Sequence, residues 1–448
     1  MFRIDSHYFS KAAIASELTL KNRRWETLGD ASSSIQSFGA YALTNQFTYT
    51  DEGIPFLRCL NIKNGFVELA NSLFIPPTAQ TLLSKSAVKP GMVLLTMSGS
   101  VGEAAVALPS WTYPINSNQD IAKIVPDPGV SPYFLTAFLN SRYGKTQAER
   151  LPVGSVQQHI FLWMLEELVV VPRFSDGFEA AIASAVQTAY ERDEDAQRFL
   201  ADAEKMLTAA LGLRDWHPPE PLTYTLRASQ ALESRRLDAE YFAPRVRELL
   251  AKLGASGRSL HDVAPPRHEK FIPAREGEFC YIEISDLHSD GTVGATRLAQ
   301  HDAPSRATQF VRAGDVITST VRPIRGLSAL ILPAQGGSVC SSGFVVLEPR
   351  AIAAEVLLTY LRLPLVCELM DLHTSASMYP AISETDLLRM PFPELGDAKT
   401  TEEIVAAVRH AHAGRRRAHD LLSAAQRSVE MAIEENESTA LNNLKRQV

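Results

Sequence analysis

The sequence predicts an α+β protein. It would have two β-rich globular domains, related by a pseudo-twofold axis and separated by two long antiparallel coiled-coil helices. Three observations lead to this prediction. A set of motifs occurs twice in the same order, a long helical segment follows each set, and the apolar positions of the two helical segments share one frame. A chain of 448 residues is also too long for one ordinary domain.

Each copy opens with a nearly identical stretch. "RIDSHYF" spans residues 3–9 and "RLDAEYF" spans residues 236–242, and a short amphipathic helical pattern follows each. The stretch predicts an extended segment that precedes the helix. In the second copy, alternation places Arg236 and Asp238 on one face and Leu237 and Tyr241 on the other.

Four further motif pairs follow the opening stretch. Together they predict the order strand, turn, strand, polar loop, strand, helix, strand in each copy. The pairs are "FLRCLNIKNGFVE" (56–68) with "YIEISDLHSDGTV" (281–293), "VKPGMVLLTMSGSVG" (88–102) with "VRAGDVITSTVRPIRG" (311–326), "PYFLTAFLNS" (132–141) with "EVLLTYLRLP" (355–364), and "LEELVVVP" (165–172) with "LLRMPFP" (387–393).

These motifs divide the chain into four parts. Residues 1–172 are predicted to form the first globular domain, and residues 173–225 the first long helix and a connector. Residues 226–395 are predicted to form the second such domain, and residues 396–448 the second long helix and a C-terminal tail.

The two helical segments carry apolar residues at spacings that alternate between four and three, as paired helices require. Alanine recurs at every seventh position, which lets two helices approach closely. Asp193 and Arg415 are the charged members of the frames, and they either set the register as buried polar residues or lie in solvent at a local break. The residues predicted to pair the helices are Ile182, Val186, Ala189, Ala196, Leu200, Ala203 and Leu207 with Ile404, Val408, Ala411, Ala418, Leu422, Ala425 and Val429.

The composition limits the class of protein. No apolar stretch approaches the ~18 residues that span a bilayer, and the first residues lack the apolar run of a signal peptide, so we expect a cytoplasmic protein that does not bind membranes. The four scattered cysteines favour neither a disulfide framework nor a zinc site. A net charge of −7 argues against a simple nucleic-acid coat, but it allows DNA binding through a local patch or with a more basic partner.

The motifs of an enzyme are not found in the sequence. It has no N/D-P-P-Y/F tetrapeptide of an adenine methyltransferase, no G-x-x-x-x-G-K-[ST] phosphate loop and no G-x-S-x-G nucleophile turn. His410, His412 and His419 lie near Asp420 on the second long helix, but this set lacks the converging ligands of a zinc site. We expect a helix surface that faces solvent or a partner, and therefore a non-catalytic binding protein with no metal and no cofactor of its own.

The sequence resembles the specificity (S) subunit of type I restriction-modification systems. The resemblance rests on "PGMVLLTMSGSVGEAAV" (90–106), "NQDIAKIVP" (118–126), "PYFLTAFLNSRYGKTQ" (132–147) and "GSVQQHI" (154–160), together with the duplication, and it covers nearly the whole chain. The second half departs from the pattern, because "SASMYPAI" (375–382) stands where "GSVQQHI" would and nothing there resembles "NQDI".

The resemblance implies a function and a set of partners. Each half would be a target-recognition domain that reads one half of a bipartite, asymmetric sequence in double-stranded DNA. The helices would fix the unread spacer and form the platform for two adenine-methyltransferase (M) subunits, which would bind S-adenosylmethionine. A motor-endonuclease (R) subunit can join such an assembly, and the S subunit itself has no catalytic activity.

Polar side chains in the loops are the candidates for contacts with base edges, because base reading needs donors and acceptors that reach the major groove. The candidates are Asn61, Lys63, Asn64, Ser98, Ser100, Gln157, Gln158 and His159 in the first half, and Ser319, Thr320, Arg322, Arg325, Ser375, Ser377 and Tyr379 in the second.

Three alternatives remain at this stage. Arg322 and Arg325 could form surface salt bridges rather than contact guanine. The stretch 118–120 reads more readily as a structural turn than as a base contact. The whole chain could be a protein-interaction scaffold with the same duplicated architecture, which its acidic net charge favours.

Overall fold

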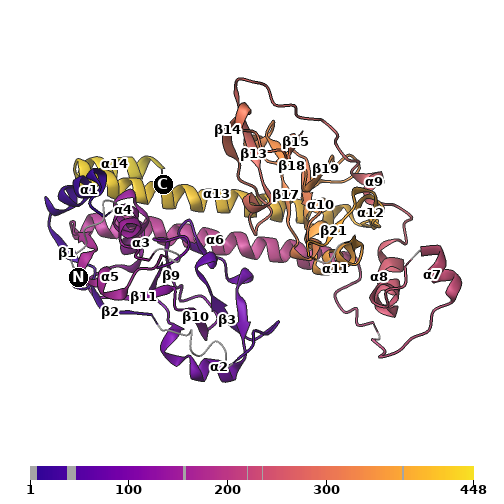
Figure 1. Cartoon of the computed structure of the whole chain (residues 1–448), viewed down its shortest axis with the longest axis horizontal. Coiled ribbons are helices and arrows are strands. Elements are labelled where there is room, and N and C mark those ends of the chain that lie inside the picture. The colour runs from indigo at the N-terminus through magenta and orange to yellow at the C-terminus, as the bar shows by residue number, and fades with distance from the viewer. Residues whose placement is uncertain are drawn as a thin grey trace. The chain divides into compact units, whose positions relative to one another are not determined.

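The computed structural model describes residues 8–37, 47–154, 158–218, 220–234, 236–375 and 378–447. The chain forms two compact units (Figure 1). Unit 1 comprises Met1–Glu194 and Arg415–Val448, and unit 2 comprises Asp195–Gly414. Two long helices, α6 (Asp176–Ala210) and α13 (Ala398–Glu434), each contribute one part to unit 1 and the other part to unit 2.

Unit 1 contains two four-stranded sheets. The first has the order β6-β3-β10-β7, and the second has the order β2-β11-β8-β9. The first sheet consists of β3 (Ile54–Leu57), β6 (Leu73–Ile75), β7 (Ala87–Val88) and β10 (Ile115–Ser117). The second consists of β2 (Ser32–Gln36), β8 (Val93–Thr96), β9 (Ala104–Val106) and β11 (Ile121–Pro126).

Helices and two short ladders complete unit 1. Ser10 caps the first helix by accepting the Ala13 N–H at 3.3 Å, and Ser131 caps the third by accepting the Phe134 N–H at 3.4 Å. The helices are α1 (Lys11–Lys21), α2 (Pro77–Leu82), α3 (Pro132–Asn140), α4 (Arg142–Arg150), α5 (Leu162–Leu168) and α14 (Glu437–Gln447). The ladders join β1 (Trp25–Thr27) to β12 (Val170–Pro172), and β4 (Ile62–Lys63) to β5 (Phe66–Val67).

Unit 2 repeats the same two sheets. The first has the order β14-β13-β18-β15 and the second has the order β17-β16-β19. The strands are β13 (Glu278–Ile282), β14 (Thr296–Ala299), β15 (Ala307–Phe310), β16 (Val316–Ser319), β17 (Ser328–Leu330), β18 (Val339–Ser341) and β19 (Phe344–Leu347). The helices are α7 (Ala228–Ser234), α8 (Pro244–Leu253), α9 (Leu260–Val263), α10 (Ala354–Arg362), α11 (Pro364–Leu372) and α12 (Glu384–Leu388), and β20 (Thr374–Ser375) pairs with β21 (Ala381–Ile382).

The two sheets of each unit confirm the predicted duplication. In each unit one parallel pair lies inside an otherwise antiparallel sheet: β3 beside β10, with Phe56 opposite Asn116, and β13 beside β18, with Tyr281 opposite Val339. The second sheets differ only at one edge. Where unit 1 has β2, unit 2 has a single bridge between Pro266 and Leu347.

The cores follow from the alternation of side chains along the central strands. On β8, Val93 and Leu95 join the apolar cluster that contains the helices, whereas Leu94 joins a second cluster with residues of the other sheet. Val316 and Ile317 of β16 divide between two clusters of unit 2 in the same way. A strand buried on both faces reads as a continuous apolar run, which is why "VLLT" and "VITS" show no polar positions on a solvent face.

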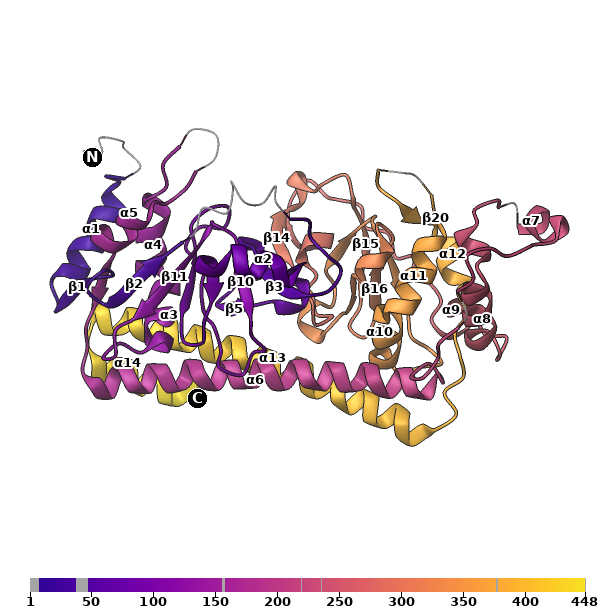
Figure 2. The same ribbon diagram turned by 90° about the horizontal axis from the view of Figure 1, so that it is seen from below.

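The long helices run antiparallel within each unit, where they lie side by side (Figures 1 and 2). In unit 1 one apolar cluster contains Ile182, Val186, Ala189, Ala418, Leu422, Ala425 and Val429. In unit 2 the helices contribute Ala203, Leu207, Ile404 and Val408, and the partly buried Leu200 packs on them. Ala196 and Ala411 are buried too. Both clusters also include residues of the sheets and of the helices that cover them. The apolar residues of α6 and α13 therefore pack against the globular part of each unit as well as against each other.

The opening stretch of the second copy differs from the extended form predicted for it. Residues 240–242 form a 3-10 turn, which brings Tyr241 back toward Arg236, and the guanidinium lies 4.3 Å from the centre of the Tyr241 ring. Arg236 also forms an ion pair with Asp238 (2.7 Å), while Leu237 is 88% exposed. Arg236 and Tyr241 therefore contact each other instead of lying on opposite faces. Residues 3–7 of the first copy lie outside the described residues.

The two charged members of the helical frames form an ion pair. Asp193 and Arg415 occupy equivalent positions in the two copies, because each lies equally far from the first residue of its own helix. Arg415 Nε lies 3.5 Å from Asp193 Oδ1, and both side chains are largely buried. Arg415 also lies 3.7 Å from Glu68. The alternative of a solvated break is therefore wrong, and opposite charges at equivalent positions make the contact attractive.

We expect this ion pair to stabilise the packing of the two helices in unit 1. A double-mutant cycle on D193N and R415Q should give a coupling energy of about 0.5–3 kcal/mol, since each single change leaves a buried group without its partner. The free energies of unfolding of the four proteins in urea measure it. Additive effects of the two substitutions would show that the pair contributes nothing to stability.

Lys123 on β11 is fully buried. Its Nζ donates to Ser117 Oγ at 2.9 Å and to the Ile121 carbonyl oxygen at 3.2 Å. Burial lowers the pKa of this lysine to about 8, because the charged ammonium has lost its hydration. The lysine therefore destabilises the fold at neutral pH.

Replacing Lys123 with Met should raise the free energy of unfolding by on the order of 2 kcal/mol near neutral pH, because Met has similar length and no charge to bury. Between pH 8 and 10.5 the unfolded chain binds more protons at this lysine than the folded chain does. The difference in stability between the variant and the wild type should therefore shrink as the pH rises through that window. Thermal unfolding of both proteins across the window measures this. A difference that does not depend on pH would contradict the assignment.

Candidate nucleic-acid interface

Three loops of unit 1 converge through main-chain hydrogen bonds. The Met97 N–H donates to the Asp120 carbonyl oxygen at 2.8 Å, and the Ile160 N–H donates to the Met97 carbonyl oxygen at 3.0 Å. Ser98 and His159 form a β-bridge beside these bonds. We call residues 97–100, 118–120 and 158–160 the unit 1 loop cluster.

Unit 2 joins the equivalent loops in the same way. The Thr320 N–H donates to the Gly343 carbonyl oxygen at 2.9 Å, and the Ile382 N–H donates to the Thr320 carbonyl oxygen at 3.0 Å. Val321 and Ala381 form the bridge that Ser98 and His159 form in unit 1. We call residues 320–326, 342–343, 374–375 and 378–382 the unit 2 loop cluster. The two clusters therefore share their main-chain construction.

Arg322 is the best-fixed side chain of the unit 2 loop cluster. It adopts the left-handed conformation (φ 51°), which is unusual for a residue other than glycine, and its N–H donates to the Pro380 carbonyl oxygen at 2.8 Å. Its guanidinium lies 5.4 Å from the centre of the Tyr379 ring and donates to the Met378 carbonyl oxygen at 3.3 Å. The loop that carries the arginines is thus tied to the β20–β21 hairpin.

Exposed apolar side chains surround these arginines. Ile324, Met378 and Tyr379 are 52%, 76% and 65% exposed, and Arg325 is exposed too. Among the residues that the structure describes, neither Arg322 nor Arg325 forms an ion pair, so nothing here supports the salt-bridge alternative. A surface of guanidinium, ring and apolar groups can contact base edges and methyl groups.

The unit 1 loop cluster carries different chemistry. Ser100 and Gln158 are exposed, and His159 Nδ1 lies 3.5 Å from Asp120 Oδ1. The Asn118 side chain donates to Asp120 Oδ2 at 3.0 Å and accepts the Asp120 N–H at 3.3 Å. Residues 118–120 therefore form the structural turn that the sequence favours, and the turn supports His159.

Three predicted contact residues have structural roles instead. Asn61 is buried, accepts the Arg58 N–H at 2.9 Å and donates to the Glu68 carbonyl oxygen at 3.3 Å. Ser319 is buried and donates to the Val321 carbonyl oxygen at 3.1 Å. Ser98 is also buried. Side chains this enclosed cannot reach a base, so we leave them out of the proposed contact set.

The remaining predicted residues fall in different places. Thr320 is half-buried in the unit 2 loop cluster, where its hydroxyl donates to the Gly343 carbonyl oxygen, and Ser375 is exposed on β20. Lys63 and Asn64 are exposed on the β4–β5 turn. This turn bonds Tyr190 of α6 through the Gly65 carbonyl oxygen, and the Asn64 N–H donates to Glu103 at 2.9 Å, three residues beyond the loop cluster residue Ser100. Gln157 and Ser377 lie outside the described residues.

Sequence reasoning missed the exposed apolar side chains that lie beside the candidate contact residues. Ile324 and Met378 were passed over because contact candidates were chosen for polarity alone. Phe161, which is 49% exposed with its ring centre 5.8 Å from that of His159, was missed for the same reason. Their positions in the sequence could have indicated them, because Ile324 lies in "STVRPIR", Met378 in "SASMYPAI" and Phe161 directly after "GSVQQHI", next to polar residues.

Two histidines of α13, His412 and His419, differ from the expected solvated or partner-facing surface, whereas His410 is exposed as expected. His412 is buried, and His419 and His410 pack their rings against Phe66 and Phe199 with ring centres 4.9 and 5.5 Å apart. Burial lowers the pKa of His412 below its usual value. The pattern misled because helical neighbours of a charged run can still face a core. No three His, Cys, Asp or Glu side chains lie close enough to hold a metal ion in the described part of the chain.

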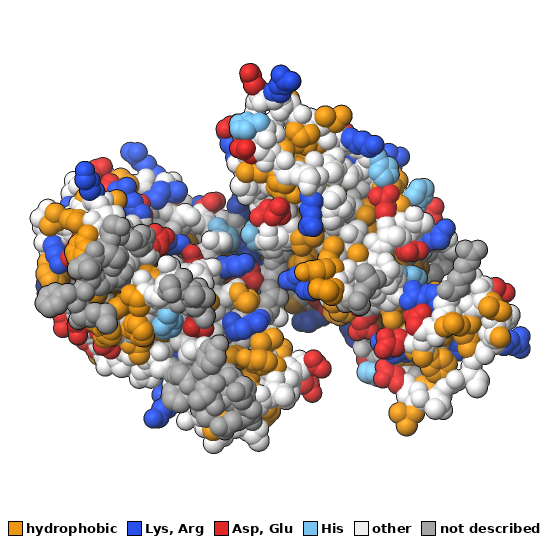
Figure 3. All heavy atoms as spheres, viewed as in Figure 1, with side chains coloured by type: hydrophobic (Ala, Val, Ile, Leu, Met, Phe, Trp, Pro, Cys, Tyr) orange, Lys and Arg blue, Asp and Glu red, His pale blue; other side chains and the backbone are white. Residues whose placement is uncertain are grey.

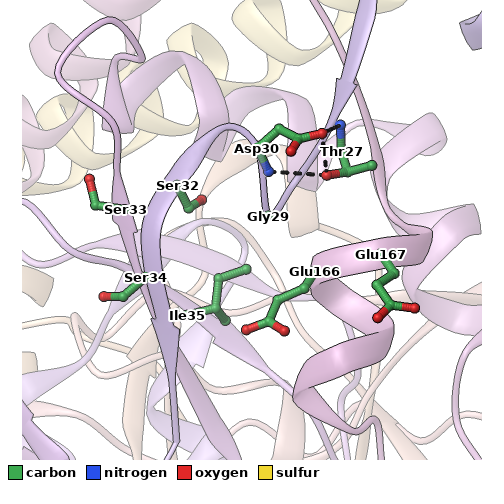
Figure 4. A pocket seen from close by; sticks show the side chains of 9 residues that line it. All are labelled: Thr27, Gly29, Asp30, Ser32, Ser33, Ser34, Ile35, Glu166 and Glu167. Atoms are coloured by element: carbon green, nitrogen blue, oxygen red, sulfur yellow. Dashed lines mark hydrogen bonds between the residues drawn. The ribbon is translucent and has the colours of Figure 1, made fainter.

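An open pocket of about 480 Å³ lies in unit 1 between the β1–β2 region and α5 (Figure 4). It is lined by Thr27, Gly29, Asp30, Ser32, Ser33, Ser34, Ile35, Glu166 and Glu167. Asp30 is held by the Thr27 hydroxyl at 2.8 Å. Three carboxylates in the lining repel a phosphate backbone, so this pocket is not part of the candidate interface.

On the face shown in Figure 3, acidic and basic side chains are intermixed over both units. Across the described helices, none is long and apolar enough to cross a membrane.

Neither a family model nor a curated protein sequence matches the chain. Solved structures that are similar to it include the S subunit of a type I restriction-modification system from M. genitalium, with 16% identity, a TM-score of 0.36 and coverage of 94% of this chain and 96% of that one. A chain from work on complex assembly and conformational transition of the type I R-M system has 17% identity, a TM-score of 0.29 and coverage of 94% and 97%. The HsdS subunit from Thermoanaerobacter tengcongensis has 16% identity, a TM-score of 0.29 and coverage of 95% and 96%.

Proposed function

We propose that this chain is the DNA sequence-recognition subunit of a type I restriction-modification complex. Unit 1 and unit 2 each read one half of a bipartite, asymmetric site in double-stranded DNA. The long helices dock two adenine-methyltransferase subunits and set the number of unread base pairs between the halves. The chain itself is non-catalytic and acts in the cytoplasm.

One observation carries this proposal. The two units repeat the same strands and the same main-chain hydrogen bonds, yet their loop clusters present different side chains at equivalent places. A duplicated scaffold with divergent loops suits a protein that reads two different short sequences, since base contacts depend on side chains and the scaffold does not. A scaffold for protein partners gives no reason for this divergence at exposed loops.

The side chains suggest what each unit reads. Arg322 and Arg325 in unit 2 suit guanine, which presents two acceptors in the major groove, and Ile324 or Met378 suits a thymine methyl group. Gln158 of unit 1 suits adenine, which presents a donor and an acceptor. Half-sites of different composition follow from these differences.

Because the chain has an acidic net charge, we expect its partners to supply part of the attraction for DNA. At −7 the chain alone has little general attraction for phosphates, so the docked methyltransferases would supply positive charge as well as catalysis. S-adenosylmethionine belongs to those subunits. R subunits, where present, would join the same assembly.

Substituting both Arg322 and Arg325 with Ala should relax base preference in one half-site only. Each guanidinium that pairs with a guanine is worth about 1–3 kcal/mol of discrimination, so the affected base should lose roughly tenfold or more in selectivity. Sequencing of methylated genomic DNA from cells that carry the complex measures both half-sites at once.

Arg297 provides a matched control, because it is an exposed arginine of the same unit on β14, outside the loop cluster. R297A should leave both half-sites unchanged. If the double variant also methylates the wild-type site set, the assignment of the two arginines is wrong.

Co-expression with an adenine methyltransferase tests the function itself. The chain should purify with two methyltransferases per copy, and the complex should methylate adenine in a split sequence, whereas the isolated chain should bind DNA weakly. A stable complex that methylates no defined sequence would support the scaffold alternative.

A further inference from the structure

Tyr190 of α6 and His412 of α13 occupy equivalent positions in the two copies. Each lies equally far from the first residue of its own helix, Asp176 in α6 and Ala398 in α13. Both side chains are buried, with 4% and 5% of their surface exposed. The two residues differ in type, but each reaches from its long helix into the globular part of its own unit.

In unit 1, Tyr190 holds the turn between β4 and β5. Its hydroxyl donates to the Gly65 carbonyl oxygen at 2.8 Å and accepts the Val106 N–H at 3.1 Å. Gly65 has a φ of +83°, and a Cβ there would collide with the Leu422 side chain on α13. The turn therefore lies against both long helices, and the Tyr190 hydroxyl links it to β9 by hydrogen bonds.

In unit 2, His412 makes the equivalent contact. Its Nε2 lies 3.0 Å from the Asp290 carbonyl oxygen, and because a carbonyl oxygen can only accept, Nε2 carries the proton. Asp290 lies as far along the chain from Tyr281 as Gly65 does from Phe56, and these two aromatic residues hold matching places in the parallel strand pairs. The turn of unit 2 is one residue longer, since Leu287 pairs with Val293 where Ile62 pairs with Val67. Two different side chains thus bond a main-chain carbonyl oxygen of the equivalent turn.

A second contact leads from this turn to the unit 2 loop cluster. Arg362, on α10, donates to the carbonyl oxygens of Ser289, Ser328 and Gly326, the last two at 3.2 and 3.4 Å. Gly326 ends the loop that carries Arg322 and Arg325. The start of α10 is held by α13 as well, since Arg409 Nε lies 2.6 Å from Glu355 Oε1.

Unit 1 has the counterpart of this contact. Asn140 is the last residue of α3, as Arg362 is the last residue of the equivalent helix α10. Its amide donates to the Ala104 carbonyl oxygen at 2.7 Å, and its oxygen accepts the Ala104 N–H at 3.0 Å. Ala104 begins β9, directly after the loop that carries Ser100. In unit 2 hydrogen bonds lead from α13 to the turn and, through Arg362, to the strand that follows the loop. In unit 1 Tyr190 of α6 bonds both the turn and β9, the strand that follows the loop.

We propose that Tyr190 and His412 are positioning residues, each of which clamps its unit to the long helix and holds that unit's loop cluster in the orientation that reads a half-site. The inference rests on the proposed function. It assigns the clamp to the contact with the turn carbonyl, which both side chains make, and the clamp of one unit acts on that unit's half-site alone.

Matched variants separate the hydrogen bond from the packing. H412L removes the donor at similar volume, whereas H412Q keeps a donor with nearly the same reach as Nε2. Y190F removes only the hydroxyl of the tyrosine. Each full-length variant is purified with its methyltransferase, and methylation is measured on a duplex pool in which every base of both half-sites is varied singly.

The ratio of correct to incorrect bases at each half-site is the readout, because partial loss of folded protein lowers methylation at both half-sites and cancels in the ratio. H412L should reduce discrimination about tenfold in the half-site that R322A and R325A affect, which corresponds to one lost base contact, and leave the other within about twofold. H412Q should stay near wild type, and Y190F should affect the opposite half-site.

Equal losses at both half-sites, unchanged ratios in H412L, or an H412Q protein that behaves like H412L would overturn the inference. These results are distinct from failure of the proposed function, which would appear already in the wild-type complex as methylation without a bipartite sequence.

Discussion

The packing of the two long helices is the constraint on which each unit depends. The apolar core of unit 1 contains Val186 from α6 and Leu422 from α13, and the core of unit 2 contains Leu207 from α6 and Ile404 from α13. The helix of each copy therefore completes the core of both units. Because buried apolar surface supplies most of the stabilising free energy, neither copy of the repeat contains all the residues that its unit needs.

Main-chain hydrogen bonds explain how one scaffold can carry two different surfaces. The loops of unit 1 are joined by the N–H and carbonyl groups of Met97, Asp120 and Ile160, and those of unit 2 by the same groups of Thr320, Gly343 and Ile382. None of these bonds depends on side-chain type, so the neighbouring side chains can vary without loss of the loop conformation. Tyr190 and His412 follow the same logic, since both bond a main-chain carbonyl oxygen.

Periodic features of the fold could be predicted from the sequence, and the roles of single polar residues could not. The duplicated strand order and the buried frame of the helices follow from alternation and from spacings of three and four, which are local properties. Asn61 and Ser319 have polar side chains of the kind that contact bases, but they form hydrogen bonds inside the unit. Lys123 is buried in a strand although it carries a charge. The hydrogen-bond partners of these residues lie within seven positions in the sequence, but their burial depends on the packing of the whole unit, which local spacing does not show. Tyr241 was placed on the wrong face because a period of two was assumed where the chain forms a 3-10 turn.

The central claim is that the loop cluster of each unit reads bases. The most direct test is a structure of the chain with its methyltransferase subunits on a duplex that the complex methylates. The account predicts the Arg322 and Arg325 guanidiniums within hydrogen-bonding distance of base edges in one half-site, and Gln158 or His159 at base edges in the other. A complex in which the DNA contacts neither loop cluster would contradict it. So would a complex in which the loop clusters contact only DNA phosphates and no base edge.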